Sequence, residues 1–228
     1  MIPVWVALDV SDLQQAEMWM NRLRPHRRFK VGLQLFMAVG PDRVRRWVDN
    51  GQQIFLDLKL HDIPNTVGAA MTKIRGLGVK MATVHASGGQ AMVRAAVDAS
   101  HGQVIVVAVT VLTSLNPAAL TDLAVPPASE WAAILAAQAM EAGAGGLVTS
   151  AHEVRTLRQL WPDARLVVPG IRPSGVAPED QARVATPRDA VFQGATDLVV
   201  GRPVLTAADP VDMLNHIELE VAHGRLAD

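Results

Sequence analysis

Several residue types are absent or scarce in this sequence of 228 residues. It has no cysteine, which excludes disulfides, thiol nucleophiles and thiolate metal ligands. It has no tyrosine, and its five tryptophans and four phenylalanines offer few rings for stacking on single-stranded nucleic acid. With 21 basic and 22 acidic residues, the net charge of -1 creates no field that attracts nucleic acid or an anionic membrane. We therefore expect no nucleic-acid or membrane partner, and local groups must hold any anionic ligand.

Long hydrophobic segments are also missing. The longest strongly apolar run, residues 104–112, is well below the roughly 18 residues that a membrane span needs. The N-terminal segment reaches Asp9 before the apolar region of a secretion signal can form. Half of the residues are hydrophobic and 19% are charged, which is typical of a folded globular chain. We therefore expect a cytoplasmic protein with a sizeable core.

Short β-rich apolar runs alternate with alanine-rich or amphipathic stretches along the chain. Eight such units predict an α/β fold, a single (β/α)8 TIM barrel over residues 1–228 with its active site at the C-terminal ends of the strands. The predicted strands are residues 4–10, 29–36, 54–60, 81–87, 104–112, 145–150, 165–171 and 197–203. The predicted helices are residues 12–23, 41–50, 64–77, 88–100, 130–143, 151–161, 186–193 and 209–223. A doubly wound open sheet is less favoured because no GxGxxG follows the first strand.

Polar side chains interrupt these otherwise apolar strands, mostly near the C-terminal ends. A parallel sheet that is covered on both faces has little room for such residues, so each needs a reason. They are Asp9, Lys30, Asp57, Lys59, Thr110, Thr113 and Arg202. Because the C-terminal ends of barrel strands carry the active site, these positions indicate functional residues.

The segment FLDLKLHDIPNT, residues 55–66, holds the most informative group of charges. Asp57 and Lys59 are two apart on a predicted strand, so both point to one face, which is the interior of a barrel. Contact between opposite charges offsets much of the cost of burying them. With Lys30 on the neighbouring strand and Asp62 at the mouth, the four residues can form an alternating chain of charges. The alternative is a structural ion pair, with Asp62 capping the next helix.

Two later segments suggest an anion site. PGIRPSG at 169–175 follows the seventh predicted strand and GRP at 201–203 ends the eighth, where barrels commonly bind phosphate. Gly201 permits close approach of the backbone, and Arg202 supplies a forked donor for phosphate oxygens. Gln181 is placed to complete the clamp. A surface ion pair for Arg202 and a solvated Gln181 are the alternatives.

Two further pairs of polar residues have more than one interpretation. Thr113 and Ser114 follow the fifth strand and can hydrogen-bond a planar heterocycle, or they can begin a turn. His61 and His85 suggest a metal site with nearby carboxylates. Two neighbouring lysines oppose a cation and no HxH or HExxH spacing occurs, so we expect no metal.

Together these motifs resemble the orotidine 5'-phosphate decarboxylase family. DLKLHDIPNT at 57–66 looks like the signature of that family. Further matching motifs are ALDV (7–10), KVGLQLF (30–36), VHASGG (84–89), VTVLTS (109–114), PGIRP (169–173), DQ (180–181) and GRP (201–203). The resemblance implies a barrel that decarboxylates orotidine 5'-monophosphate (OMP) to UMP, the last step of de novo UMP synthesis, without a metal, flavin or pyridoxal cofactor. It also implies a homodimer with its sites at the subunit interface.

The resemblance implies a role for each matching residue. Asp9 and Lys30 would bind the ribose hydroxyls, and Lys30 would also orient Asp57. Asp57 would face the substrate carboxylate, and Lys59 would lie beside C6 of the pyrimidine.

The remaining matches would contact the nucleotide from elsewhere in the dimer or the barrel. Asp62 and Thr66 would reach into the site of the neighbouring subunit. The others would serve three parts of the site, namely Thr113 at the pyrimidine, Arg172 and Gln181 in the closing loop, and Gly201 with Arg202 at the phosphate.

Two other functions remain as alternatives. A metal-dependent sister group decarboxylates 3-keto-gulonate 6-phosphate or joins formaldehyde to a pentulose phosphate, and it resembles this chain in the D-x-K-x-x-D arrangement. That group has an acidic metal ligand where this chain has Lys30, and it lacks the PGIRP-to-DQ loop. The other alternative is a catalytically silent nucleotide-binding barrel, which the intact Lys59 and Asp62 argue against.

Overall fold

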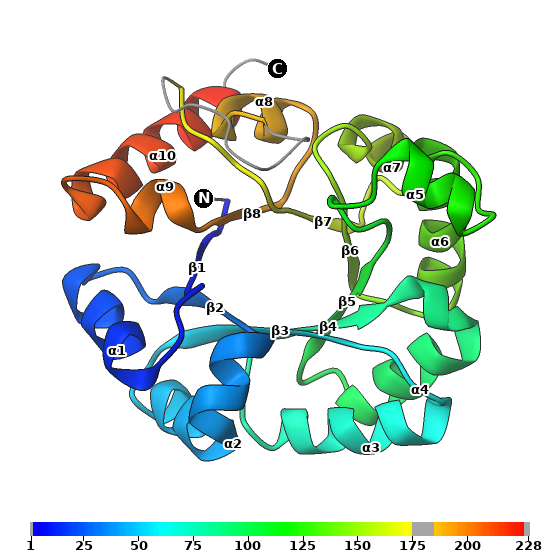
Figure 1. Ribbon diagram of the computed structural model, residues 1–228, viewed down its shortest axis with the longest axis horizontal. Coiled ribbons are helices and arrows are strands. Elements are labelled where there is room, and N and C mark those ends of the chain that lie inside the picture. Colours follow the sequence, from blue (N-terminus) through cyan, green and yellow to red (C-terminus); the bar gives the residue numbers. More distant parts are fainter. Residues whose placement is uncertain (1, 175–184, 226–228) are drawn as a thin grey trace.

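Eight parallel strands close into a barrel with the helices around it (Figure 1). This computed structural model describes residues 2–174 and 185–225. The strands follow one another around the barrel in chain order, which confirms the predicted (β/α)8 fold. They are β1 (Val4–Ala7), β2 (Arg28–Gly32), β3 (Gln53–Leu60), β4 (Met81–His85), β5 (Ile105–Val109), β6 (Gly146–Val148), β7 (Arg165–Val168) and β8 (Asp197–Val200).

The helices form the outer layer of the barrel (Figure 1). They are α1 (Leu13–Arg22), α2 (Leu33–Asp49), α3 (Pro64–Arg75), α4 (Gly89–Ser100), α5 (Pro117–Asp122), α6 (Ala128–Glu141), α7 (Val154–Leu160), α8 (Pro187–Phe192), α9 (Arg202–Leu205) and α10 (Pro210–Arg225). A short 3-10 helix, Ala86–Gly88, precedes α4. Within the described ranges, none of the helices combines the length and the apolar character that crossing a bilayer requires.

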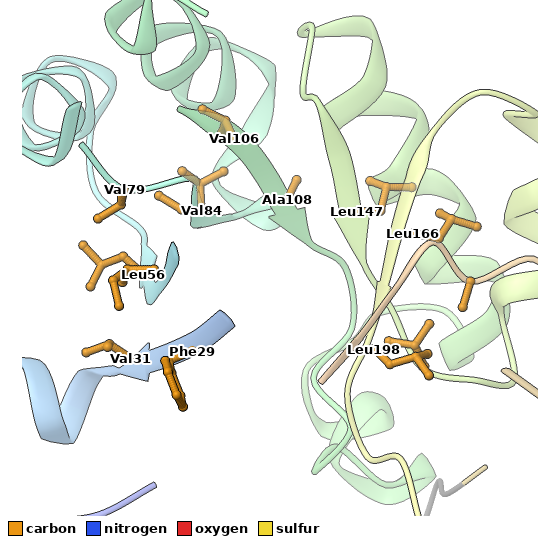
Figure 2. Close-up of a cluster of buried hydrophobic side chains, with 14 of the residues drawn as sticks. Phe29, Val31, Leu56, Val79, Val84, Val106, Ala108, Leu147, Leu166 and Leu198 are labelled. Carbon is orange, nitrogen blue, oxygen red and sulfur yellow. The ribbon is translucent and has the colours of Figure 1, made fainter. Parts of the chain in front are cut away.

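The buried side chains form two clusters, one on each face of the sheet. The outer cluster lies between strands and helices, and Figure 2 shows part of it, with Phe29, Val31 and Leu56 near one another. The inner cluster fills the barrel, and it consists of Trp5, Ala7, Phe55, Met81, Val107, Val167 and Val199. Side chains alternate between the two faces of a strand. Because Phe55 points inward, Asp57 two residues later also faces the barrel interior.

Several predicted strands extend beyond the observed ones, most clearly residues 29–36. β2 ends at Gly32 and α2 begins at Leu33. A short apolar run fits either a strand or a helical turn, and here Leu35 is buried while Leu33 is exposed. The predicted helix start at residue 41 corresponds to a break within α2, where Gly40 has a φ of 72°.

Two short helices were not predicted. The α5 helix begins after Asn116, whose side chain accepts the backbone N–H of Ala119, and Pro117 occupies the first helical position. Asparagine followed by proline is a recognisable start signal. The α9 helix lies within the predicted strand 197–203, because β8 ends at Val200 and the chain turns at Gly201.

A fully buried carboxylate joins the starts of β7 and β8 to β1, at the end of the barrel away from the predicted site. Asp197 accepts hydrogen bonds from Trp5 Nε1 at 2.9 Å, from Arg165 Nη1 at 2.9 and 3.1 Å, and from Thr196 Oγ1 at 2.9 Å. Burial raises the pKa of Asp197, although the Trp5 hydrogen bond and the Arg165 charge oppose that shift. Because these donors satisfy the buried carboxylate, its role is to stabilise the barrel.

Removing this carboxylate should destabilise the protein. We expect Asp197→Ala to lower the free energy of unfolding by about 2–4 kcal/mol, since it leaves a buried indole N–H without a partner and removes the ion pair with Arg165. Urea unfolding followed by circular dichroism measures the change. Asp122→Ala, at an exposed position, is the control and should change stability by less than about 0.5 kcal/mol. Equal effects of the two substitutions would contradict the role given to Asp197.

Candidate active site

A cavity of about 240 Å³ opens at the C-terminal ends of the strands. Its apolar walls include Ala7, Phe55, Val109, Val148 and Val199. The predicted site residues that line it are Asp9, Lys30, Asp57, Lys59, Thr113, Arg172, Gly201 and Arg202. Eight residues chosen from the sequence therefore meet around one cavity at the end of the barrel where they were expected.

Charges of alternating sign run along one wall of this cavity. Lys30 Nζ lies 3.3 Å from Asp9 Oδ1 and 3.4 Å from Asp57 Oδ2. Lys59 Nζ lies 2.9 Å from Asp57 Oδ1 and 3.0 Å from Asp57 Oδ2. The parallel pairing of β1 with β2 and of β2 with β3 brings these side chains together. The order along the wall is therefore Asp9, Lys30, Asp57 and Lys59.

Mutual attraction keeps the buried members of this group charged. Burial alone would raise the pKa of Asp57, but the charges of Lys30 and Lys59 outweigh it and hold the pKa below the usual value. Burial alone would lower the pKa of Lys30, but Asp57 and Asp9 outweigh it and hold that pKa above the usual value. The pair therefore contributes stability at neutral pH. The Asp57 part is lost as the pH falls through its folded pKa, and the Lys30 part as the pH rises through its own.

The backbone of β3 is irregular where it carries the reactive groups. Leu56 pairs with Ala82 and Leu60 with Val84, so the register between β3 and β4 shifts over this stretch. Lys59 has a φ of 51°, in the left-handed region that few residues other than glycine adopt. Such strained backbone occurs often at functional sites. The contact of Lys59 with Asp57 therefore depends on a local distortion as well as on strand alternation.

Two arginines line the cavity from the ends of β7 and β8, across the barrel from the strand that carries Asp57 and Lys59. In a closed barrel of eight strands, β7 and β8 lie across from β3 and β4. Arg172 follows β7 and is 7% exposed, and Arg202 follows β8 and is half-buried. A Cβ on Gly201 would lie 3.2 Å from Asp9 Oδ2, so glycine permits the close approach of β8 to β1. Two guanidinium groups beside this backbone are suited to an anion such as phosphate.

Two of the predicted residues that the structure describes do not line the cavity of their own chain. Asp62 and Thr66 are exposed, and Asp62 Oδ1 accepts the backbone N–H of Ile63 at 2.6 Å. The alternating chain was predicted to run from Lys30 to Asp62, but within one chain the fourth charge is Asp9. Asp62 lies beyond the end of β3, its side chain is exposed, and it is not part of the cavity lining. Gln181 lies outside the described residues.

The other polar candidates, Thr110, His61 and His85, contact neighbouring protein groups. Thr110 Oγ1 donates to the carbonyl of Val148 at 3.1 Å and so links the ends of β5 and β6. The His61 and His85 rings lie 5.4 Å apart, and burial together with the charges of His61 and Lys59 lowers the pKa of His85. In the part of the chain that the structure describes, no three His, Asp or Glu side chains gather in a way that could hold a metal ion.

Comparison with known proteins places this site in a family. The sequence model of the orotidine 5'-phosphate decarboxylase / HUMPS family matches residues 3–217. The chain belongs to this family. An orotidine 5'-phosphate decarboxylase of Anaeromyxobacter dehalogenans is 50% identical over 210 residues, which cover 91% of this chain and 92% of that protein. One of Nitrosococcus oceani is 46% identical over 226 residues, covering 96% and 97%.

A solved member of the same decarboxylase family has the same fold. The crystal structure of orotidine 5'-phosphate decarboxylase from Lactobacillus acidophilus superposes with a TM-score of 0.88 at 35% identity. The match covers 97% of this chain and 99% of that one. The family that the motifs resembled is thereby confirmed.

One residue that contacts this site was not selected in the sequence analysis. Thr83 on β4 is 1% exposed, and its Oγ1 contacts both Asp57 Oδ1, at 3.0 Å, and the backbone nitrogen of Lys59, at 2.7 Å. It is a polar residue within an apolar strand, the same signal that selected Lys30. That signal applied to Thr83 would have found it.

Proposed function

We propose that this member of the orotidine 5'-phosphate decarboxylase family converts OMP to UMP and CO2 with its own side chains and no cofactor. The observation that carries the proposal is the contact of Lys59 with Asp57 at 2.9 Å, in a cavity whose opposite side holds Arg172 and Arg202. This arrangement suits a ligand with a reacting group at one end and a phosphate at the other. The names of the relatives support OMP as that ligand.

Lys59 has two tasks in this reaction. When the bond from C6 to the carboxylate breaks, CO2 leaves and the electron pair stays on C6, where no adjacent carbonyl accepts it. A fixed ammonium beside C6 stabilises that negative charge. The same ammonium then donates a proton to C6 to give UMP, and solvent restores the proton to Lys59.

Asp57 acts on the substrate before the bond breaks. Its carboxylate, held ionised by two lysines, would lie beside the carboxylate of OMP and disfavour it. Like charges about 4 Å apart repel by about 4 kcal/mol at an effective dielectric of 20. The reaction needs a barrier reduction toward the top of the ~8–23 kcal/mol range of enzymes, so this repulsion contributes only part.

Phosphate binding supplies energy far from the reacting carbon. We assign the phosphate to Gly201 and Arg202, with Arg172 and Gln181 in the segment that closes over it, Thr113 at the pyrimidine, and Asp9 with Lys30 at the ribose hydroxyls. Binding energy from a remote group can drive closure and exclude water, which strengthens every charge interaction inside.

Removing the arginine at the phosphate should chiefly weaken binding. We expect Arg202→Ala to lower kcat/KM for OMP by about 10²-fold, since a forked charge-assisted contact is lost. Reaction with orotidine, which lacks the phosphate, should hardly change. The measurement is kcat/KM for both substrates, with the exposed Arg155→Ala as control. A loss that is equal for OMP and orotidine would place the phosphate elsewhere.

We further propose that the active form is a homodimer with shared sites. Asp62 is exposed and outside its own cavity, although it follows directly after the strand that carries Lys59. Large apolar side chains are exposed near the same ends of β2 and β3, namely Leu33 (57%), Met37 (74%) and Ile63 (65%). Covering them against a second copy would let Asp62 and Thr66 complete the neighbouring site.

The first experiment is direct. Protein stripped of metal with a chelator is incubated with OMP, pyrimidine absorbance is followed, and released CO2 is counted. Loss of OMP with one CO2 per UMP supports the proposed reaction and its independence from metal. Activity only on a keto-sugar phosphate after Mg²⁺ is restored would instead indicate the metal-dependent sister group. Lys30 disfavours that outcome, because its ammonium already lies between two carboxylates.

A further inference from the structure

We propose that Thr83 is a positioning residue for the decarboxylation, because its one hydroxyl fixes Asp57 and the backbone of Lys59 relative to each other. The proposal rests on the reaction proposed above for these two residues. Thr83 Oγ1 lies 2.7 Å from the backbone nitrogen of Lys59 and 3.0 Å from Asp57 Oδ1. The residue is buried on β4, on the strand next to the one that carries both partners.

The direction of both hydrogen bonds follows from the chemistry of the groups. The backbone N–H of Lys59 can only donate, so Thr83 Oγ1 accepts it. The ionised carboxylate of Asp57 can only accept, so the single hydroxyl hydrogen of Thr83 points to it. Both functions of the hydroxyl are used, and a methyl group in its place would supply neither.

The Lys59 bond compensates for the irregular backbone. The register shift between β3 and β4 removes the regular ladder around Lys59, and Thr83 supplies the acceptor that its N–H needs. Without that acceptor, the N–H of Lys59 would lose its partner on β4, and the φ of 51° would be less firmly held. Relaxation to the extended region would move the ammonium away from its contact with Asp57.

The Asp57 bond sets the orientation of the carboxylate. Oδ1 receives the Thr83 hydroxyl, and Oδ2 lies 3.4 Å from Lys30 Nζ. Lys59 Nζ contacts both oxygens at nearly equal distances, so it favours neither orientation. Thr83 and Lys30 therefore fix the rotation of the carboxylate from opposite sides. The Thr83 hydrogen bond also helps to keep the pKa of Asp57 below its usual value.

The test compares substitutions that keep or remove the hydroxyl. We expect Thr83→Val to lower kcat for OMP by about 10²-fold, the cost of misplacing a catalytic group by about an ångström. The dissociation constant of UMP should change less than about threefold. Thr83→Ser, which restores the hydroxyl, should keep kcat within about tenfold of the original protein.

A second measurement does not depend on activity. Carbon-13 NMR titration of the Asp57 carboxyl should give a higher pKa in Thr83→Val than in Thr83→Ser or the unsubstituted protein, because only the valine variant loses the hydrogen bond. Thr110→Val is the matched control, since it removes a buried hydroxyl whose hydrogen bond to the carbonyl of Val148 links β5 to β6. It should lower stability without changing kcat or the pKa of Asp57. If Thr83→Val does not fold, Thr83→Ala serves in its place.

The outcomes separate this inference from the proposed reaction. An unsubstituted protein without activity on OMP would contradict the reaction, while the titration would still decide whether Thr83 holds Asp57. With an active protein, kcat of Thr83→Val within about threefold of the original would overturn the positioning role. A serine variant as impaired as the valine variant would also overturn it, since packing of the methyl group would then be what matters.

Discussion

Lys59→Ala should lower turnover of OMP by at least about 10⁴-fold while UMP still binds. Removing one electrostatic group typically costs about 10²–10³ in rate, and removing a proton donor about 10²–10⁴. Lys59 is the side chain that would do both, because its ammonium contacts Asp57 inside the cavity. On the proposed assignments, UMP would bind mainly through phosphate and ribose contacts, which the substitution would leave in place.

The measurement combines OMP absorbance with calorimetric titration of UMP. Lys80→Ala is the control, because Lys80 is exposed at the opposite end of the barrel, just before β4. Circular dichroism establishes that both variants are folded. Turnover of Lys59→Ala within about tenfold of the original would remove Lys59 from its role as stabiliser and proton donor.

Mixing two inactive variants should restore activity if the sites are shared. In a dimer of one Lys59→Ala chain and one Asp62→Ala chain, one site lacks both groups. The other site combines Lys59 of one chain with Asp62 of its partner, so it is intact. With random exchange half of the dimers are mixed, and the expected activity is about a quarter of the original. If Asp62 served its own chain's site, no mixed dimer would contain an intact site.

A second mixture supplies the control. Lys30 and Lys59 line the same cavity within one chain, so Lys30→Ala mixed with Lys59→Ala should give no recovery. Differently tagged chains, purified through both tags, establish that exchange has taken place. Mixed dimers of Lys59→Ala with Asp62→Ala that stay inactive would contradict the proposal that Asp62 acts in the site of the partner chain.

The barrel and its charged wall were predictable because both follow from simple periodicities. Apolar runs separated by amphipathic stretches define βα units, and strand alternation places Asp57 on the same face as Phe55, inside the barrel. Lys30 was found because a charge in a strand buried on both faces needs a partner, and the partner is Asp57 at 3.4 Å. These inferences use only local order and the cost of burying a charge.

The exact ends of strands and the irregular backbone were not predictable from those rules. The apolar residues after Gly32 fit both the two-residue period of a strand and the 3.6-residue period of a helix. Packing in the barrel makes them the first turn of α2. The residue type at position 59 does not predict a left-handed φ, because lysine does not favour that region. The link from Thr83 to Lys59 depends on that distortion, so strand alternation alone does not reveal it.

The charged residues that line the cavity come from two separate parts of the sequence. Asp9, Lys30, Asp57 and Lys59 all belong to the first three strands or their ends, whereas Arg172 and Arg202 follow the last two. On the roles proposed above, the groups beside the reacting carbon and the ribose therefore come from the first part of the chain, and the groups that would hold the phosphate come from the last part. If those proposed roles hold, substitutions after β7 and β8 would alter which anion the barrel binds, and the reacting groups on the first three strands would stay the same. A fold arranged in this way can acquire new substrates without rebuilding its reactive centre.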